Sequence, residues 1–343
     1  MFKFPAFLIA AIAWGGLAFS PFSFASANPQ PLPTQQFSKT RSLSYRLKAI
    51  IRLTNTKLPS PRTTGQGIVP LNYLKDGIAW TVEVKVGQQT ATFLLDTGAS
   101  MSMVSPNLTK KLGLTGKPLP PEETRFAVAG NECKEMKAAI YALPPISLGQ
   151  AQIQGLHALQ LSQAVIPENL DGILGMDALR YFNLRLDPVQ KTLELLPPSP
   201  IPNRDRAQAI PLLIQDNVPL VEVKINDSVS YLFLVDTGAE STFISPKIAK
   251  QLQLPPDAMQ PVQVQGFCGL EPANYTALGK VQVGNQHLNQ VEAVVLQNTA
   301  VLESLKVDGI LGQNFLNAFH QSWYFNSRVS TKTHKALILT PLN

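Results

Sequence analysis

One sequence pattern occurs twice in this chain, and the repeat restricts the fold more than any other feature. In the first copy three apolar residues, 93–95, lead into Asp96-Thr-Gly-Ala. In the second copy the apolar residues 233–235 lead into Asp236-Thr-Gly-Ala. A Ser-Pro pair follows each Asp at the same distance, and the two aspartates lie 140 residues apart. This agreement in order and spacing indicates two copies of one folding unit.

Later segments repeat in the same order and divide the chain into two similar halves. Asp171-Gly-Ile-Leu-Gly175 in the first half matches Asp308-Gly-Ile-Leu-Gly312 in the second. The proline-rich segment 197–202 lies between the copies and is typical of a linker. We therefore expect three parts after the N-terminal region: an N-terminal lobe over 66–197, a linker over 198–207 and a C-terminal lobe over 208–343.

Each copy has the hydrophobic pattern of short strands. Residues 81–86 and 221–225 alternate between apolar and polar side chains, which is typical of a strand with one buried face. The apolar run before each Asp is typical of a strand that is buried on both faces. Short helices are expected only after the Ser-Pro pairs, where proline favours a first helical turn, and after Gly175 and Gly312. The sequence therefore predicts an all-β fold of two lobes.

The composition argues against several classes of function. Cys133 and Cys268 are too few for a disulfide framework and lack zinc-type spacing, and the four histidines are isolated in the sequence. We therefore expect no metal and no cofactor. The net charge of +6 arises in residues 28–75, which hold eight basic residues and no acidic one, whereas the chain from Asp76 onward is near −3. A nucleic-acid-binding domain would carry its basic excess on the folded part, so no nucleic-acid partner is expected.

The N-terminus has the pattern of a secretory signal. Lys3 precedes an apolar run, and Ala25-Ser-Ala27 supplies small residues where a signal peptidase cleaves. Residues 4–24 are also about long enough, at roughly 20 residues, to serve as an uncleaved membrane tether. Residues 1–27 are therefore predicted to be a signal peptide or a membrane anchor. Either makes the protein secreted, periplasmic or membrane-anchored, facing a non-cytosolic compartment.

Residues 28–65 form a basic arm that is rich in Pro, Ser and Thr. Within the arm, one face would hold five residues if the segment is helical, namely Leu43, Leu47, Ile50, Ile51 and Thr54. Such an arm is either a solvated linker or a basic helix that lies on a membrane surface. A third interpretation is a pro-segment that lies over an acidic cleft of the body. The sequence leaves these alternatives open.

Two Asp-Thr-Gly turns can supply the chemistry of amide hydrolysis. A single turn of this kind is often only structural, with Gly providing an unusual backbone angle and Asp capping the turn. Two carboxylates held close together cannot both ionise, so the pair shares a proton. The protonated partner can then donate to a substrate carbonyl while the ionised partner takes a proton from an attacking water. Asp96 and Asp236 are therefore the candidate catalytic pair.

With these residues the chain resembles the aspartic peptidases, and Asp-Thr-Gly-Ala resembles their retropepsin-like (retroviral-type) branch. The resemblance implies two retropepsin-like or pepsin-like β-barrel lobes, related by a pseudo-two-fold axis, with the active site between them. It implies an aspartic endopeptidase that hydrolyses peptide bonds of a peptide or protein substrate. It also implies supporting residues, namely a cross-lobe Thr pair and the small residues around the two turns: Thr97, Gly98, Ala99, Gly175, Thr237, Gly238, Ala239 and Gly312.

The same family carries a hairpin flap over the site. Candidate flap tips are Val128-Ala129-Gly130 in the first lobe and Val264-Gln265-Gly266 in the second, since each offers Gly near apolar residues. Cys133 and Cys268 follow the two tips at similar distances and are either two free thiols or a disulfide between the flaps. Glu240, which follows the second turn, is either a solvated surface side chain or a cleft-side carboxylate that selects a basic substrate residue.

The chain also departs from the family pattern. Retroviral members build the site from two identical chains, whereas this chain carries both halves, so a monomer is expected, with a homodimer as the alternative. Met176 and Gln313 stand where the family commonly has Arg, so the family's ion pair is not expected. Ala99 and Ala239 lack the hydroxyl that hydrogen-bonds a carboxylate in pepsin-like enzymes. Losing that donor disfavours the ionised form, so we expect activity at mildly rather than strongly acidic pH.

Two interpretations of a different class stay open. The first is a catalytically silent peptide-binding module that kept this fold, although an intact Asp-Thr-Gly in both copies favours an enzyme. The second is a membrane-surface protein in which the basic arm is the functional part.

Overall fold

A computed structural model describes residues 44–46, 50–53, 58–120, 124–127, 136–162, 166, 169–227, 229–266, 269–329 and 332–342. All of them belong to one compact unit, Phe37–Leu342. Strands predominate, and the α-helices in this part of the chain have only four to six residues. No helix among these residues is long and apolar enough to cross a membrane. The predicted all-β, two-lobed architecture is confirmed.

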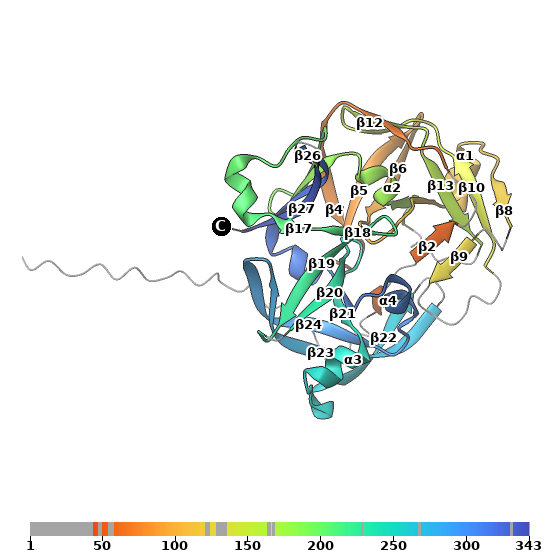
Figure 1. Cartoon of the computed structure of the whole chain (residues 1–343). Coiled ribbons are helices and arrows are strands. Elements are labelled where there is room, and N and C mark those ends of the chain that lie inside the picture. The colour runs from red at the N-terminus through yellow and green to blue at the C-terminus, as the bar shows by residue number, and fades with distance from the viewer. Residues whose placement is uncertain are drawn as a thin grey trace, which may run out of the picture. The chain divides into compact units, whose positions relative to one another are not determined.

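The first half of the chain forms a lobe of β-strands (Figure 1). Buried aliphatic and aromatic side chains fill its core. In its central strand β5, the valines at 82, 84 and 86 are buried while Glu83 and Lys85 are exposed, as the alternating pattern predicted. The elements of this half are β3 (Arg62–Thr64), β4 (Gly67–Tyr73), β5 (Trp80–Val86), β6 (Gln89–Leu95), β7 (Met103–Val104), α1 (Pro106–Lys111), β8 (Lys117–Leu119), β9 (Thr124–Ala127), β10 (Ala138–Ala142), β11 (Ile146–Leu148), β12 (Ala151–Gln154), β13 (His157–Leu161), β14 (Gly172–Leu174), α2 (Met176–Leu179), β15 (Asn183–Asp187) and β16 (Thr192–Leu196).

The second half repeats the main elements in the same order and adds α4, a helix outside the four places where the sequence predicted one. Its strand β19 alternates in the same way, with Val221, Val223 and Ile225 buried. The elements are η2 (Asn203–Gln208), β17 (Ile210–Pro211), β18 (Leu213–Gln215), β19 (Val218–Ile225), β20 (Ser230–Val235), β21 (Thr242–Ile244), α3 (Pro246–Gln251), η3 (Pro256–Ala258), β22 (Gln260–Gly266), β23 (Gly269–Val283), β24 (Gln286–Leu296), α4 (Ala300–Leu305), β25 (Gly309–Leu311), α5 (Gln313–Leu316), β26 (Phe319–Val329) and β27 (Lys332–Pro341).

The repeated Ile-Leu-Gly segments have the same place in both lobes. In the first lobe β14 pairs in parallel with β6, so that Leu174 is the partner of Leu95. In the second lobe β25 pairs in parallel with β20, so that Leu311 is the partner of Val235. The Asp that opens each segment fixes this register, because the Asp171 carboxylate accepts from the Thr92 amide at 3.0 Å and its counterpart in the second lobe does the same at 3.1 Å.

The predicted helices after the Ser-Pro pairs are present as α1 and α3. Ser105 caps α1 by accepting from the Leu108 amide at 3.2 Å, and Ser245 caps α3 by accepting from the Ile248 amide at 3.3 Å. In each helix the proline occupies the first turn, where no amide donor is needed. The two helices expected after Gly175 and Gly312 are present as well, as the single turns α2 and α5.

Sheets cross the boundary between the two halves of the sequence. The C-terminal hairpin β26–β27 pairs with β15 of the first half, with Asn183 opposite Tyr324, and extends the first lobe's sheet. Strand β3, which the sequence placed in the basic arm, pairs with β12 and so also belongs to this sheet. A 3-10 helix, η2, covers the second half of the expected linker. The lobes are therefore joined by backbone pairing as well as by a linker.

The described residues of the N-terminal arm form strands and not the helix that the apolar spacing of the arm suggested. Residues 44–46 form β1, which pairs with β22, and residues 50–53 form β2, which pairs with β9. A lone helix of this length is marginal, whereas strand partners far away in the sequence satisfy the backbone of the arm. Pairing between distant segments leaves no periodic signal in the arm itself, so the helical prediction was wrong for these seven residues.

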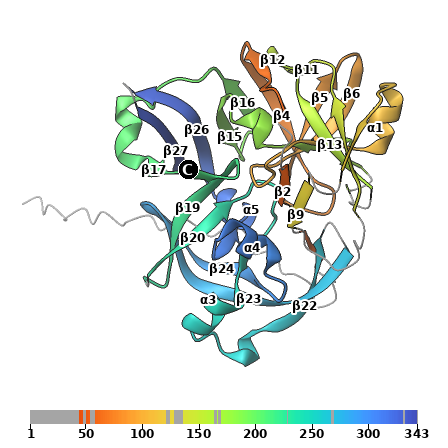
Figure 2. The same cartoon turned by 45° about the vertical axis from the view of Figure 1, so that its right-hand side comes forward.

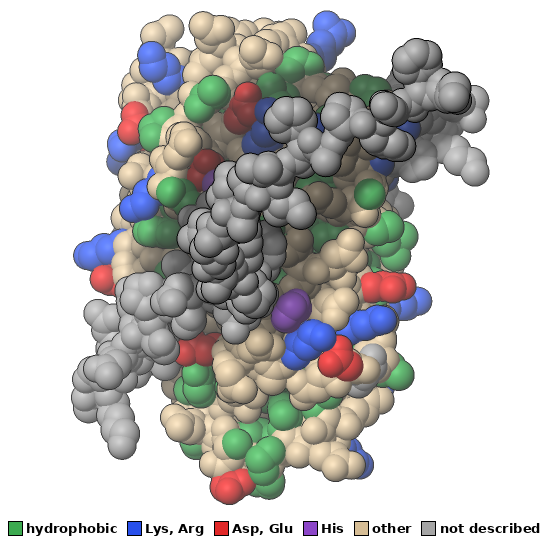
Figure 3. All heavy atoms as spheres, turned by 90° about the vertical axis from the view of Figure 1, so that its left-hand side faces the viewer, with side chains coloured by type: hydrophobic (Ala, Val, Ile, Leu, Met, Phe, Trp, Pro, Cys, Tyr) green, Lys and Arg blue, Asp and Glu red, His purple; other side chains and the backbone are tan. Residues whose placement is uncertain are grey.

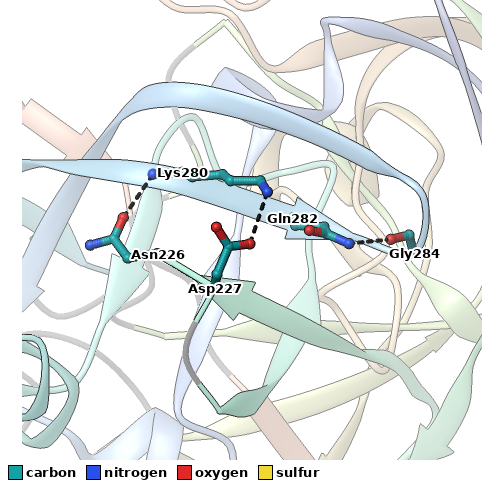
Figure 4. A network of polar contacts seen from close by, with 5 residues as sticks. All are labelled: Asn226, Asp227, Lys280, Gln282 and Gly284. Atoms are coloured by element: carbon teal, nitrogen blue, oxygen red, sulfur yellow. Dashed lines mark hydrogen bonds and ion pairs between the residues drawn. The ribbon is translucent and has the colours of Figure 1, made fainter.

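A tight turn joins β19 to β20 and fixes the edge of the second lobe (Figure 4). Asn226 and Asp227, the first two residues after β19, both have positive φ, 52° and 55°. The Asn226 side chain accepts from the Lys280 amide at 2.8 Å, and the Lys280 ammonium bonds Asp227 at 2.8 Å. A Cβ on Gly279 would lie 2.4 Å from the Asn226 side-chain oxygen, so this turn needs glycine beside it.

Charged side chains on the described surface are mixed in sign. On the face drawn in Figure 3, acidic and basic groups alternate over the described residues, with apolar side chains between them. This matches the nearly balanced charge of the chain from Asp76 onward.

Corresponding residues of α2 and α5 reach across to the opposite lobe. Asn317, the C-cap of α5, accepts from the indole nitrogen of the fully buried Trp80 at 2.7 Å and donates to the Ile78 carbonyl at 3.0 Å. Arg180, the C-cap of α2, donates to Asn217 of the second half. The two contacts stand at equivalent places in the repeat and link the lobes from both sides.

We predict that Asn317→Ala lowers the unfolding free energy by about 1–3 kcal/mol, because it leaves the buried Trp80 indole N–H without its acceptor. Urea denaturation of the purified chain measures the change. Asn289→Ala, at an exposed position in β24, is the control and should stay within about 0.5 kcal/mol of the parent. Equal stabilities for the two variants would contradict the role assigned to Asn317.

Candidate active site

The two candidate aspartates lie at the ends of equivalent strands and are buried. Asp96 follows β6 and is 0% exposed, and Asp236 follows β20 and is 1% exposed. The amide of Asp96 donates to the Leu174 carbonyl at 3.1 Å, and the amide of Asp236 donates to the Leu311 carbonyl at 3.0 Å. Each Asp is therefore held by paired strands of its own lobe: β6, β14 and β7 in the first lobe, and β20, β25 and β21 in the second.

Thr97 and Thr237 connect the two turns through reciprocal hydrogen bonds. The Thr97 amide donates to the Thr237 hydroxyl and the Thr237 amide donates to the Thr97 hydroxyl, both at 3.0 Å. Each hydroxyl then donates to a carbonyl of the opposite lobe, Thr97 to Val235 at 2.7 Å and Thr237 to Leu95 at 2.9 Å. All four bonds are buried, so the turns are held together where water does not compete.

Gly98 lets the first turn approach the carboxyl of the second. A Cβ at this position would lie 2.4 Å from the Asp236 Cγ, which no real side chain could do without moving the carboxyl. The residues that the sequence proposed from two distant segments, Asp96-Thr97-Gly98 and Asp236-Thr237, are thus brought into direct contact.

Backbone amides bind one oxygen of each carboxyl. The amide of Ala99 donates to Asp96 Oδ1 at 3.0 Å. Asp236 Oδ1 accepts from the amide of Gly238 at 2.8 Å and from that of Ala239 at 3.2 Å. These hydrogen bonds come from backbone amides, so the small side chains of Gly238, Ala99 and Ala239 are not needed as donors. The bonds fix the orientation of both carboxyl groups.

The glycines of the Ile-Leu-Gly segments pass directly beneath the turns. A Cβ on Gly175 would lie 2.8 Å from the Ala99 carbonyl oxygen, and one on Gly312 would lie 2.2 Å from the Ser241 carbonyl oxygen. The next residue in each lobe, Met176 or Gln313, donates its amide to the carbonyl of the alanine in the turn at 2.8 Å. A larger residue than glycine would therefore displace the Asp-Thr-Gly turn.

The two lobes differ in the side chain that follows this glycine. In the second lobe the Gln313 side chain is fully buried and its Nε2 donates to the Thr237 carbonyl at 2.8 Å. Met176, at the same place in the first lobe, has no donor to offer. Gln313 therefore holds the second turn by an extra hydrogen bond, a role that the sequence comparison noted only as a departure from the family's Arg.

Sequence reasoning missed a polar support beneath the first turn. The Ser102 hydroxyl accepts from the Gly175 amide at 3.0 Å and donates to the Asp177 carboxylate at 2.6 Å. The amide of Ser102 bonds the same carboxylate at 2.9 Å. In the second lobe the equivalent pair is neutral, with the Thr242 hydroxyl donating to Asn314 at 2.9 Å. The sequence offered one signal for this difference: the second residue after the matching Leu-Gly is Asp in the first lobe and Asn in the second.

Desolvation by the surrounding protein raises the pKa of Asp177 to about 6, against the opposing effects of the Ser102 hydrogen bonds and the Arg180 charge. In an unfolded chain an Asp carboxyl has a pKa near 3.9, roughly the model-peptide value. Between these two values the folded chain binds more protons at this group than the unfolded chain does. The unfolding free energy therefore falls as pH rises through this window.

The candidate flap of the second lobe lies in a hairpin. Val264, Gln265 and Gly266 are the last residues of β22, and Gly266 is the partner of Gly269 at the start of β23. Val264 is fully buried in a core cluster, so it anchors the hairpin rather than forming its tip. The first-lobe candidates Val128, Ala129 and Gly130 lie outside the described residues, as do Cys133 and Cys268.

Glu240 contacts the first lobe. A Cβ on Gly77, in the turn between β4 and β5, would lie 1.6 Å from the Glu240 Oε1, so the carboxyl fills the space that this glycine leaves. Ser100, the corresponding residue of the first turn, is 4% exposed. Glu240 is thus a contact between the lobes, which neither sequence interpretation of this residue had included. Among the described residues no group of three or more His, Cys, Asp or Glu side chains could hold a metal ion.

We predict that Thr97→Val lowers the unfolding free energy by about 2–4 kcal/mol, because it removes one buried donor to Val235 and one buried acceptor for the Thr237 amide. Chemical denaturation provides the measurement. Thr97→Ser keeps the hydroxyl and should lose much less. If Val and Ser cost the same, the hydroxyl does not carry the contact between the turns.

We also predict that Asp177→Asn removes a pH-dependent component of stability. Relative to this variant, the parent chain should lose unfolding free energy as pH rises from about 4 to about 6, since the buried carboxyl ionises over that range. Denaturation curves at closely spaced pH values test this. Asn314→Asp is the matched change in the second lobe and should introduce a similar dependence; parallel curves for the parent and Asp177→Asn would refute the prediction.

Comparison with known proteins agrees with this geometry. A family model described as aspartyl protease matches the chain twice, over residues 82–178 and 221–315. Each match contains one Asp-Thr-Gly turn and the Ile-Leu-Gly segment beneath it. None of the curated proteins compared with the chain matches it. The two matches together cover more than half of the chain, which therefore belongs to the aspartyl protease family, in a retropepsin-like form with two tandem lobes.

Proposed function

We propose that the protein is an aspartic endopeptidase in which Asp96 and Asp236 together activate a water molecule that hydrolyses a peptide bond. The observation that carries the proposal is the set of reciprocal bonds between Thr97 and Thr237, which brings two intact Asp turns into contact. Two carboxyl groups that are held close together can share a proton. At this junction each lobe supplies one of the two.

In the proposed reaction the protonated carboxyl donates a hydrogen bond to the carbonyl oxygen of the scissile amide. The ionised carboxyl takes a proton from water while the water oxygen bonds to the carbonyl carbon. Collapse of the tetrahedral species breaks the C–N bond, and a carboxyl delivers the proton to the leaving nitrogen. The backbone amides on Asp96 Oδ1 and Asp236 Oδ1 support this chemistry by keeping both groups oriented without reorganisation during the reaction.

We further propose that one chain is the working unit, because both halves of the site lie in it. The substrate is a peptide or protein, and residues 1–27 direct the enzyme out of the cytosol or tether it to a membrane. Sedimentation as a single-chain species would support the first statement, and a stable dimer would contradict it.

The decisive test compares the full chain with Asp96→Asn and Asp236→Asn on a denatured protein between pH 3 and pH 7, with and without pepstatin. Each substitution should lower the cleavage rate by about 10³-fold or more, because either one removes half of the acid–base pair. Cleavage by the parent should be sensitive to pepstatin and fastest at mildly acidic pH.

Asp257→Asn, at an exposed position in η3, is the control and should leave the rate unchanged. Full activity in either active-site variant would overturn the shared-proton mechanism. A parent chain that binds peptides but cleaves none would instead support the alternative, a catalytically silent peptide-binding module.

A further inference from the structure

The two Asp turns rest on equivalent residues that differ in one respect. Met176 and Gln313 each donate a backbone amide to the carbonyl of the alanine in the turn above, at 2.8 Å in both lobes. Both side chains are 0% exposed. The backbone beneath the turns is therefore arranged alike, and the lobes differ in the side chain at this place, a thioether in the first and an amide in the second.

Gln313 begins α5, directly beneath the second turn. Figure 2 shows this helix beside β20, the strand that leads into Asp236. The Gln313 side chain donates from Nε2 to the Thr237 carbonyl at 2.8 Å. A carbonyl oxygen can only accept a hydrogen bond, so this contact fixes which end of the side-chain amide faces the turn.

The other end of this amide is buried and unpaired. Gln313 Oε1 makes no hydrogen bond to any described residue, and the side chain is closed to solvent. An unpaired buried acceptor costs stability. Met176 shows that an apolar side chain can fill the same place without this cost. The fold therefore does not require an amide here, and what the amide provides is its hydrogen bond to the turn.

The carbonyl that Gln313 binds belongs to the peptide unit that holds the Asp236 carboxyl. The Thr237 carbonyl and the Gly238 amide are the two ends of one peptide unit, and Gly238 donates to Asp236 Oδ1 at 2.8 Å. A peptide unit that accepts a hydrogen bond at its oxygen is polarised and donates more strongly at its nitrogen. Because donation to a carboxylate stabilises the ionised form, Gln313 acts on the charge of Asp236 through one peptide unit.

The first lobe does not show this connection among its described residues. Met176 has no N–H in its side chain to offer to the turn. The amide of Ala99 donates to Asp96 Oδ1 at 3.0 Å, whereas no hydrogen bond joins the Gly98 amide, the counterpart of that of Gly238, to Asp96. The two turns therefore hold their carboxyl groups unequally.

We propose that Gln313 is a positioning residue that divides the roles of the two aspartates: it favours negative charge on Asp236, so that Asp236 acts as the base and Asp96 as the acid. The proposal rests on the proposed peptidase function and deepens it. In the first step a water O–H bond breaks, its proton moves to the Asp236 carboxylate and the water oxygen bonds to the carbonyl carbon. The electron pair of the C=O π bond moves to the carbonyl oxygen, which takes the proton of Asp96.

Other charged or titratable side chains surround the two turns. In the described part of the chain they are Asp171 and Asp308 at the starts of β14 and β25, Lys247 at 3.8 Å from Asp308, Asp177 beneath the first turn, Arg180 at the end of α2 and Glu240 in the second turn. Gln313→Met leaves all of these groups in place. A difference in titration between the parent and this variant therefore measures what Gln313 contributes.

The first experiment measures ionisation without catalysis. NMR follows the carboxyl signals of 13C-labelled aspartate in the full chain with Asp96→Asn, where Asp236 titrates without its coupled partner. Adding Gln313→Met should lower the Asp236 ionisation constant about threefold and so raise the midpoint of its titration by about half a pH unit, because the weakened donor disfavours the carboxylate. In the Asp236→Asn chain the same addition should leave the Asp96 titration unchanged. An Asp236 midpoint that is the same with and without Gln313→Met would overturn the proposal.

Gln321→Met is the matched control. Gln321 is 1% exposed and also donates from Nε2 to a carbonyl, that of Leu316 at 3.1 Å, but its oxygen accepts from the Trp323 indole nitrogen at 3.2 Å. Removing this amide should lower the urea midpoint of unfolding and leave the Asp236 titration as it was. Gln313→Met should do the reverse and unfold near the parent's midpoint, since it leaves the turn carbonyl unpaired but removes the unpaired Oε1. If both variants only lose stability, Gln313 has no role beyond structure.

The second experiment uses the reaction itself. The kcat/KM of the parent and of Gln313→Met is measured on a denatured protein between pH 3 and pH 7. On the acid side of the profile, where the base must be ionised, the variant should be about threefold slower, and the two profiles should converge toward the optimum. Coincident profiles would overturn the assignment of the base to Asp236. A chain that cleaves nothing but shows the shifted Asp236 titration would remove the peptidase function and keep the effect of Gln313 on Asp236.

Discussion

The site depends on a single buried contact, the exchange of hydrogen bonds between Thr97 and Thr237. Each hydroxyl accepts a hydrogen bond from the amide of the other turn and donates one to a carbonyl of the opposite strand. Both hydroxyls are therefore used as donor and as acceptor. Removing one hydroxyl would leave an amide and a carbonyl buried and unsatisfied, which costs more than the bond itself contributes. The same contact that joins the lobes therefore also positions the carboxyl groups, and stability and chemistry cannot be separated at this point.

Repetition made much of this structure predictable from sequence. A lone Asp-Thr-Gly is a weak signal, but its recurrence with a matching Ile-Leu-Gly placed both turns, the strands beneath them and the glycines that pack there. The contacts that sequence could not supply join segments with no common pattern, such as Trp80 with Asn317 across the lobes. The prediction of a helix in the arm failed for the same reason. The partners of β1 and β2 lie far away in the chain, whereas the local spacing of apolar residues favoured a helix.

The two lobes share the same arrangement of strands and Asp turns but differ in the side chains that hydrogen-bond beneath those turns. Met176 and Asp177 of the first lobe stand against Gln313 and Asn314 of the second, so one turn is supported by an ionisable side chain and the other by neutral amides. A homodimer made of one gene product cannot hold such a difference, because any change appears in both halves. The proposed peptide substrate has a direction, and two unequal halves can each adapt to one side of it.

The C-terminal hairpin has a consequence for the order of folding. β26 and β27 complete the sheet that begins with β15 and β4 of the first half, so the first lobe stays unfinished until the last strand has been synthesised. During translation the edge of β15 waits for a partner some 130 residues later in the chain, and long-range pairing of this kind is slow. A chain that is interrupted before β26 has no complete first lobe. The turn that carries Asp96 therefore rests on a complete first lobe only after the C-terminal hairpin has been synthesised.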